Sequence, residues 1–352
     1  MYVKRLVLQH FRSYQQQTFT FDPHTTLVVG PNTAGKTNLV ESLFMLSFGK
    51  SFRAEKDVQM IAFGEEIGRI QGLITNTDDT EKTKLEVMLA QGEMTGGRFT
   101  KKFLVNDVPK RRIDFEGLLP LVLFSPEELD IVIAGPSLRR RFLDEVLEQV
   151  DREYRVARVQ YDKAIRQRNA LLSFAKETGK RSKEQFAYWD ELLITNGQRI
   201  TQKREEFLSF VNQQDKDIFS FTAVYDKSVV SEARLLQYTD AEIGAGVTLV
   251  GPHRDDFFME MDSEKNIRSF GSRGQQRLVV LQLKLLQINF IAQSLGFRPL
   301  LVLDDIFSEL DAKNTGLVLA MIHQQQTIIT TANKELVPEK IVAGMNMIEL
   351  KK

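Results

Sequence analysis

The chain has 352 residues and no net formal charge, because 47 lysines and arginines balance 47 aspartates and glutamates, so affinity for a polyanion must come from local basic clusters. Its hydrophobic content of 42% excludes global disorder, and the absence of cysteine excludes disulfides, a thiol nucleophile and thiolate metal sites. No stretch reaches the roughly 18 apolar residues of a membrane-spanning helix, and the start shows no apolar signal core, so we expect a cytoplasmic protein without membrane contact.

The first fifty residues predict strands followed by a loop and a helix. Val3–Leu8 is largely apolar, Gln17–Phe21 alternates with a period of two, and Thr25–Val29 is a short β-branched run. A glycine-containing loop follows, after which apolar residues recur at helical spacing between Lys36 and Phe48. Further strands are predicted downstream, at Ile67–Ile74, Leu85–Ala90, Phe99–Val105 and Leu118–Phe124.

The middle of the chain is helical in pattern. Between Leu143 and Leu171 apolar residues follow spacings of four and three, broken only at Arg168, and this heptad pattern predicts one long helix. After the polar stretch Lys180–Lys183, a similar stripe runs from Phe186 to Phe210. We therefore expect two antiparallel helices that form a short coiled-coil hairpin.

Strand-like sequence returns in the last third, so one α/β head is interrupted by a helical insertion. The predicted strands are Phe221–Tyr225, Phe257–Met261, Leu300–Leu303 and Thr327–Thr330. The expected domains are an N-terminal part of the head at 1–125, a helical lobe at 126–220 and a C-terminal part of the head at 221–352.

A phosphate-binding loop lies between the predicted strand Thr25–Val29 and the helix that follows. Residues 30–37 match G-x-x-x-x-G-K-[ST], and the flanking strand and helix are the context this motif requires. Backbone N–H groups and the helix N-terminus can cradle phosphates, Lys36 can neutralise the β and γ oxygens, and the Thr37 hydroxyl can ligate Mg²⁺. The ATP-binding residues predicted here are Gly30, Pro31, Asn32, Thr33, Ala34, Gly35, Lys36, Thr37 and Asn38.

Two carboxylates end the buried strand predicted at Leu300–Leu303. A phosphate-loop enzyme needs such groups to hold Mg²⁺ and to orient water beside the γ-phosphate. Asp304 suits the metal role and Asp305 the catalytic role of polarising water. Taken alone, an acidic strand end is equally suited to capping the next helix.

A third motif resembles the signature of ABC-type ATPases. Residues 271–275 read Gly-Ser-Arg-Gly-Gln, where that family usually has Leu-Ser-Gly-Gly-Gln, and they precede an apolar helix at 278–291. The resemblance implies that Ser272, Gly274 and Gln275 contact the γ-phosphate held by a second subunit. Taken alone, a serine and glycine here would be a helix cap. Residues 308–311, Ser-Glu-Leu-Asp, match the D-loop of the same family.

With these motifs placed, nearly the whole chain resembles the bacterial RecF family of recombination proteins. Further marks of the resemblance lie at 10–14, 49–53, 124–129, 135–144 and 250–256. The resemblance implies an ABC/SMC-like P-loop ATPase head with the helical lobe inserted. It also implies an ATP-dependent homodimer that binds duplex DNA and junctions of single- and double-stranded DNA without sequence preference. With RecR and RecO, such a protein helps RecA to load during repair.

The same resemblance suggests roles for three more residues. By analogy with SMC-like heads, Arg12 and Ser13 would lie near the α-phosphate or the base of ATP. Glu127 falls where such heads have a loop that senses metal and γ-phosphate, although glutamine is usual there. Asp305 replaces the usual catalytic glutamate and no histidine follows the strand at 327–330, so we expect slow ATP hydrolysis.

The DNA-binding residues are less defined. Lys110, Arg111 and Arg112 form a basic cluster that could contact DNA phosphates, with Arg139–Arg141 and the helical hairpin as further candidates. A solvated face paired to acidic neighbours explains the same cluster equally well. His253 is more typical of a structural histidine than of a catalytic base.

Two alternative functions remain open from the sequence. The protein could be the nucleotide-binding subunit of a membrane transporter, against which stand the helical insertion and the segment at 251–255. It could also be a non-catalytic DNA scaffold that ATP switches on and off.

Overall fold

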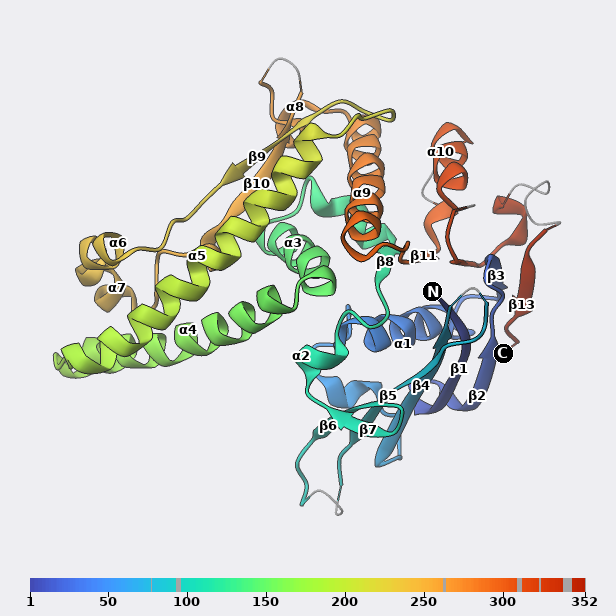
Figure 1. The fold of residues 1–352 in the computed structure, drawn as a ribbon, viewed down its shortest axis with the longest axis horizontal. Coiled ribbons are helices and arrows are strands. Elements are labelled where there is room, and N and C mark those ends of the chain that lie inside the picture. The colour runs from blue at the N-terminus through green and yellow to red at the C-terminus, as the bar shows by residue number, and fades with distance from the viewer. Residues whose placement is uncertain are drawn as a thin grey trace. The chain divides into compact units, whose positions relative to one another are not determined.

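The computed structural model describes residues 1–76, 78–92, 96–261, 264–308, 312–322, 324–337 and 344–351. The chain forms two compact units, which Figure 1 shows as a ribbon. We call Met1–Leu129 together with Lys284–Lys352 the head unit, and Asp130–Leu283 the helical unit. This division differs from the expected domains, because residues 221–283 group with the helices and not with the head.

The head unit contains an antiparallel sheet of six strands in the order β2-β1-β4-β5-β6-β7. Burial alternates along β4, because one face of the sheet packs on the core. Their bounds are Tyr2–Phe11 for β1, Tyr14–Thr20 for β2, Ile67–Thr75 for β4, Lys82–Ala90 for β5, Thr100–Val105 for β6 and Val108–Lys110 for β7.

A second sheet of the head unit is fully parallel, in the order β13-β3-β12-β11-β8. Its central strands are buried along their length, as expected for a parallel sheet covered on both faces. The bounds are Thr25–Val29 for β3, Leu121–Phe124 for β8, Leu300–Asp304 for β11, Thr327–Thr331 for β12 and Asn346–Glu349 for β13.

Helix α1, Lys36–Phe48, follows β3 and contacts strands of both sheets. It is buried on all sides, because 11 of its 13 residues have little exposed surface. Gly49 ends the helix in the left-handed conformation. Two further helices of the head are α2, Arg112–Phe115, and α10, Ala312–Ile322. The strands and the helix expected around the phosphate loop are thus confirmed.

The helical unit is built on α3, Pro136–Val150, α4, Arg152–Thr178, and α5, Lys183–Gln213. The expected hairpin is confirmed for α4 and α5, which pack along one another (Figure 1). The expectation of one helix from 143 to 171 was wrong, since the chain breaks at Asp151. The Asp151 carboxylate accepts hydrogen bonds from the backbone N–H groups of Glu153 and Tyr154, and so caps α4.

The same unit holds a two-stranded sheet and further helices. Strands β9, Thr222–Asp226, and β10, Asp256–Glu260, pair with each other and belong to neither sheet of the head. The short helices are α6, Glu232–Gln237, α7, Thr239–Ala245, and α8, Ile267–Phe270.

Helix α9, Arg273–Leu295, begins in the helical unit and ends in the head unit. Among the described residues it is the one helix whose length and composition would suit a membrane span, which is weak evidence by itself. The most apolar 18-residue stretch of α9 is 56% buried inside the protein. Such burial is typical of a core helix in a globular protein.

Candidate nucleotide-binding site

The phosphate loop joins β3 to α1 through a tight turn at Gly35. Gly35 has a φ of 98°, in the left-handed region that favours glycine. A Cβ atom there would also lie only 2.7 Å from Oη of Tyr14. The Tyr14 hydroxyl donates a hydrogen bond to the Gly35 carbonyl at 3.0 Å. The β1–β2 hairpin therefore supports the loop and requires glycine at its last position.

Lys36 lies over its own loop. Its ammonium donates to the carbonyls of Gly30 at 2.7 Å and Pro31 at 3.0 Å, and the residue is buried. The ammonium is thus held at the loop, where phosphate oxygens can offer it further acceptors. An open cavity of about 320 Å³ lies beside it, lined by Asn32, Thr33, Gly35, Lys36, Thr37, Asn38, Arg53 and Asp305.

Asp304 ends β11 next to the phosphate loop. Its Oδ1 accepts a hydrogen bond from Thr330 at 2.5 Å, and Thr37 also donates to this carboxylate. Burial raises the pKa of Asp304, and the charges of Asp305 and Glu127 raise it further, against the hydrogen bonds from Thr330 and Thr37. A buried carboxylate beside a hydroxyl is the oxygen donor set that Mg²⁺ prefers, so these residues fit the ion.

The catalytic candidates Asp305 and Glu127 are placed differently. Asp305 has a φ of 51° and lines the cavity together with residues of the phosphate loop. Glu127 is exposed, and its carboxylate accepts a hydrogen bond from the Ser125 hydroxyl at 2.8 Å. Its effect on the pKa of Asp304 places it in the same neighbourhood.

A cluster of charged residues borders the other end of the cavity. Glu41 on α1 is fully buried and accepts from Arg12 at 2.6 and 2.8 Å, from Arg53 at 2.8 Å and from Ser51 at 2.5 Å. Burial would raise the pKa of Glu41, but these three donors outweigh it and lower the pKa. The hydroxyl of Ser13 accepts a hydrogen bond from Asn38 at 2.8 Å.

Arg12 and Ser13 therefore each contact a residue of α1, and Asn38, the partner of Ser13, lines the cavity. The sequence did not assign a role to Glu41 or to Arg53. A carboxylate inside an otherwise apolar helix was the available signal for Glu41. Arg53 belongs to one of the segments that marked the family resemblance.

The signature residues lie in the helical unit, whereas the phosphate loop belongs to the head unit. The backbone N–H of Gln275 donates to the Ser272 hydroxyl at 3.2 Å, and the Ser272 N–H donates to the Gln275 side chain at 2.9 Å. This reciprocal pair caps α9. Ser272 and Gly274 are exposed at the helix N-terminus. Residues 309–311 of the predicted D-loop lie outside the described residues.

The basic cluster at the edge strand β7 is exposed. Arg111 pairs with Asp114 at 3.0 Å and Arg112 with Glu116 at 2.6 Å, while Lys110 ends the strand. The acidic partners agree with the solvated-face interpretation, and the exposure agrees with DNA contact.

Arg139 is ruled out as an exposed DNA contact. Its guanidinium is buried, forms a two-pronged ion pair with Asp256 at 2.6 and 2.8 Å, and donates to the carbonyl of Ala134 at 2.6 Å. The reason is its place on α3 against β10, where the guanidinium joins two elements of the helical unit. Arg140 donates to the carbonyl of Asp255 at 2.7 Å.

His253 has a structural environment. Its Nε2 lies 3.1 Å from the Thr248 carbonyl and its Nδ1 lies 2.7 Å from the Tyr161 hydroxyl. Because a carbonyl only accepts, Nε2 donates to it and Nδ1 of the neutral ring accepts from Tyr161. Both nitrogens are occupied, so the ring is not available as a base.

Comparisons with known proteins show the family of this chain. A model of the "RecF/RecN/SMC N terminal domain" matches residues 2–349. Proteins named "DNA replication and repair protein RecF" are similar to this chain. That of Herpetosiphon aurantiacus is 33% identical over 362 residues, or 95% of this chain and 94% of the relative. That of Moorella thermoacetica is 33% identical over 360 residues, or 99% and 94%.

Two solved structures are similar over the same length. One is described as the recombination mediator protein "RecF-ATPrS in RecFOR pathway", with a TM-score of 0.86, 30% identity, and coverage of 96% of this chain and 94% of that one. The other, "RecF-ATP", has a TM-score of 0.85 and 30% identity, over 95% and 92%. The fold is that of an ABC/SMC-like ATPase, and the chain belongs to the RecF family.

Proposed function

We propose that this protein is an ATP-dependent DNA-binding protein of recombinational repair and replication restart. The observation that carries the proposal is a single cavity lined by Lys36 and Thr37 of the phosphate loop and by Asp305, the residue after β11. It joins the phosphate loop to the end of β11, and so assembles one nucleotide site from the two ends of the sequence. The similarity to RecF structures solved with ATP supports the same ligand here.

The proposed chemistry follows from the charges around the cavity. Lys36 binds the β and γ oxygens of ATP, and the loop N–H groups and the N-terminus of α1 bind the remaining phosphate oxygens. Thr37 and Asp304 would hold Mg²⁺, which neutralises charge on the phosphates. Asp305 orients and polarises the attacking water, with Glu127 beside it. Arg12 and Ser13 contact the α-phosphate or the base.

An aspartate is one carbon shorter than the glutamate usual in ABC ATPases, so we propose that hydrolysis is slow and stimulated by DNA. The exposed N-terminus of α9 carries Ser272, Gly274 and Gln275. We propose that these residues bind the γ-phosphate held by a second copy, so that ATP drives dimerisation.

The proposed partners are duplex DNA and junctions of single- and double-stranded DNA, bound without sequence preference. RecR and RecO are proposed as protein partners that act with this protein to load RecA, an indirect partner. The pathway named for the similar solved structures supports this proposal. The work would take place in the cytoplasm.

Sedimentation velocity with gapped DNA, with and without Mg-ATP, tests cofactor, oligomer and partner together. We expect a monomer without nucleotide and a DNA-bound dimer with ATP. Lys36→Met removes the charge at the phosphates and should lose the response to ATP, whereas Lys102→Met, an exposed lysine on β6, should keep it. If the sedimentation of the parent protein changes with neither ATP nor DNA, the proposal is excluded. Stable association with an apolar membrane protein would support the transporter alternative instead.

Turnover separates an ATPase from a non-catalytic scaffold. Asp305→Asn keeps the shape of the side chain but removes its ability to take a proton from water. We expect Asp305→Asn to bind ATP like the parent and to hydrolyse it at least tenfold more slowly. Equal turnover in parent and variant would favour the scaffold.

A further inference from the structure

We propose that the Thr330 hydroxyl is a positioning group that holds the two carboxylates at the end of β11 in their working arrangement. This inference rests on the proposed ATPase site and adds a residue that contacts neither the phosphates nor the attacking water. Thr330 lies on β12, the neighbour of β11 in the parallel sheet, directly opposite Asp304 in the strand register.

One hydroxyl group contacts both aspartates. Thr330 Oγ1 donates a hydrogen bond to Oδ1 of Asp304 at 2.5 Å. The same oxygen accepts a hydrogen bond from the backbone N–H of Asp305 at 3.2 Å, and that N–H also reaches the Thr330 carbonyl at 3.1 Å. The side chain and backbone of Thr330 thus hold the first carboxylate and the peptide that carries the second.

The two aspartates need such a support because they are consecutive. In a regular strand, successive side chains point to opposite faces of the sheet. Asp304 accepts a hydrogen bond from Thr37, and Asp305 nevertheless lines the cavity of the same phosphate loop. The chain achieves this by turning Asp305 into the left-handed region, with a φ of 51°, a conformation that is strained for a residue other than glycine.

The hydrogen bonds from the Asp305 N–H to Thr330 are what stabilise this turn. Without the Thr330 hydroxyl, the Asp305 N–H would keep only its hydrogen bond to the Thr330 carbonyl. Of the two hydroxyl groups that donate to Asp304, only that of Thr37 would remain. The carboxylates would then sample more orientations, with the largest effect on the step that needs both. ATP binding through the phosphate loop does not involve Thr330 and should persist.

The chain provides a matched control in the same strand. Thr327 is as fully buried as Thr330, but its hydroxyl lies 3.2 Å from the Ile322 carbonyl and 3.3 Å from the Gln325 carbonyl. Replacing either threonine by valine removes one buried hydroxyl with little change in shape. The two variants differ in which acceptors are affected: the carboxylates for Thr330, backbone carbonyls for Thr327.

The test combines steady-state ATP hydrolysis with calorimetric titration of ATP, in Mg²⁺ and in EDTA, and with thermal unfolding. We expect Thr330→Val to lower kcat about 10- to 100-fold, as loss of groups that orient metal ligands typically does, with KM within about threefold of the parent. The gain in ATP affinity that Mg²⁺ provides should shrink by a similar factor, whereas affinity in EDTA should stay within about twofold. Thr330→Ser, which keeps the hydroxyl, should restore most of both quantities.

Several results would overturn the inference. The inference fails if Thr330→Val has the same kcat as the parent and the same gain in ATP affinity from Mg²⁺. It also fails if Thr330→Val and Thr327→Val lose equal amounts of these two quantities. Failure of Thr330→Ser to recover above Thr330→Val would also contradict it. If Thr330→Val does not fold, Thr330→Ala is measured against Thr327→Ala in the same way. A parent that hydrolyses no ATP would refute the proposed ATPase instead, and the titrations in Mg²⁺ and EDTA would still decide the role of Thr330.

Discussion

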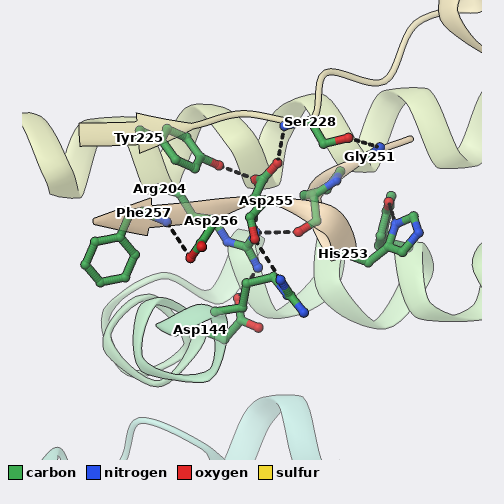
Figure 2. A network of polar contacts seen from close by, with 12 residues as sticks. Asp144, Arg204, Tyr225, Ser228, Gly251, His253, Asp255, Asp256 and Phe257 are labelled. Carbon is green, nitrogen blue, oxygen red and sulfur yellow. Dashed lines mark hydrogen bonds and ion pairs between the residues drawn. The ribbon is translucent and has the colours of Figure 1, made fainter. Parts of the chain in front are cut away.

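Arg204 and Asp255 are both completely buried, and Nη1 of Arg204 lies 3.1 Å from Oδ2 of Asp255. Arg204 comes from α5 and Asp255 from the residue before β10, so the pair joins the hairpin to the two-stranded sheet. Nη2 of Arg204 also lies 2.7 Å from Asp144 on α3, and Figure 2 shows the guanidinium between these carboxylates. One side chain therefore connects three elements of the helical unit.

Replacing Arg204 by methionine should strongly destabilise the helical unit. The change leaves Asp144 and Asp255 buried without their main counter-charge, and loss of one partner of a buried pair costs about 3–5 kcal/mol. The exposed Arg199→Met on the same helix breaks only a surface pair with Glu153 and should cost less than about 1 kcal/mol. Urea unfolding followed by the fluorescence of Trp189, the single tryptophan, which lies on α5, measures both. Similar midpoints for the two variants would contradict the assigned role of Arg204.

The stability of the helical unit should fall in mild acid because of His253. Burial lowers the pKa of His253, the hydrogen bond to the Thr248 carbonyl opposes this, and the charges of Arg254, Arg140 and Arg168 add to it, so that the pKa falls to about 4 from the ordinary 6.5. The unfolded chain therefore binds a proton between these pH values while the folded chain does not. The contribution of the neutral ring is complete above pH 6.5 and is lost as the pH falls towards 4, by about 2–3 kcal/mol.

The measurement compares urea unfolding of the parent and of His253→Asn between pH 7 and pH 4. The variant should be less stable at pH 7 but should lose less stability on acidification. His24→Asn removes an exposed histidine of the head and should keep the slope of the parent. An unchanged slope in His253→Asn would assign the acid sensitivity to other groups.

Local sequence sufficed to propose the nucleotide site, because the residues proposed for it belong to short motifs. The loop at 30–37 and Asp304–Asp305 each carry their own strand context, and the structure places them together. Heptad periodicity could not show the break at Asp151, because the apolar spacing continues across it from Leu147 to Tyr154. An aspartate at the start of a helix is a capping signal, but the spacing of apolar residues contains no information about it.

Long-range pairing explains the other differences. Arg168 interrupts the apolar stripe because it pairs with Asp190 at 2.6 Å and Glu242 at 2.7 Å inside the unit. The sequence around Arg204 does not predict its partners, because Asp255 and Asp144 are 51 and 60 residues away along the chain. Strands β9 and β10 have ordinary strand patterns, and only their mutual pairing separates them from the sheets of the head.

Ser272→Arg should abolish dimerisation induced by ATP while nucleotide binding by the monomer stays nearly intact. The added bulk and charge would stand where the proposed partner subunit brings its γ-phosphate. Ser269→Arg adds the same side chain three residues earlier at another exposed position, and should dimerise like the parent. Sedimentation with a non-hydrolysable ATP analogue measures the dimer, and calorimetry measures binding. Normal dimerisation of Ser272→Arg would exclude the proposed contact across the interface.

The basic cluster on β7 and α2 predicts a salt-dependent affinity for DNA. The logarithm of affinity should fall with the logarithm of salt concentration by about 0.9 for each phosphate neutralised. Replacing Lys110, Arg111 and Arg112 by alanine should flatten this slope by about two to three and weaken all sequences alike. Fluorescence anisotropy with a short duplex, with and without ATP, measures the slope.

A second triple variant removes the same charge elsewhere. Lys180, Arg181 and Lys183 lie at the turn between α4 and α5, and their replacement by alanine should leave the slope unchanged. If only this variant flattens the slope, the DNA site lies on the hairpin. If neither variant does, the cluster on β7 is a solvated face paired with Asp114 and Glu116.

Strand β3 lies between β12 and β13 in the parallel sheet, although residues 25–29 are separated from both partners by most of the sequence. On the ribosome, the phosphate loop therefore emerges early but has no neighbouring strand until residues 300–349 have been made. The helical unit is one continuous segment, 130–283, and can pack as soon as that segment is free. Translation that stops short of β11 would yield a formed hairpin and a head unable to hold ATP.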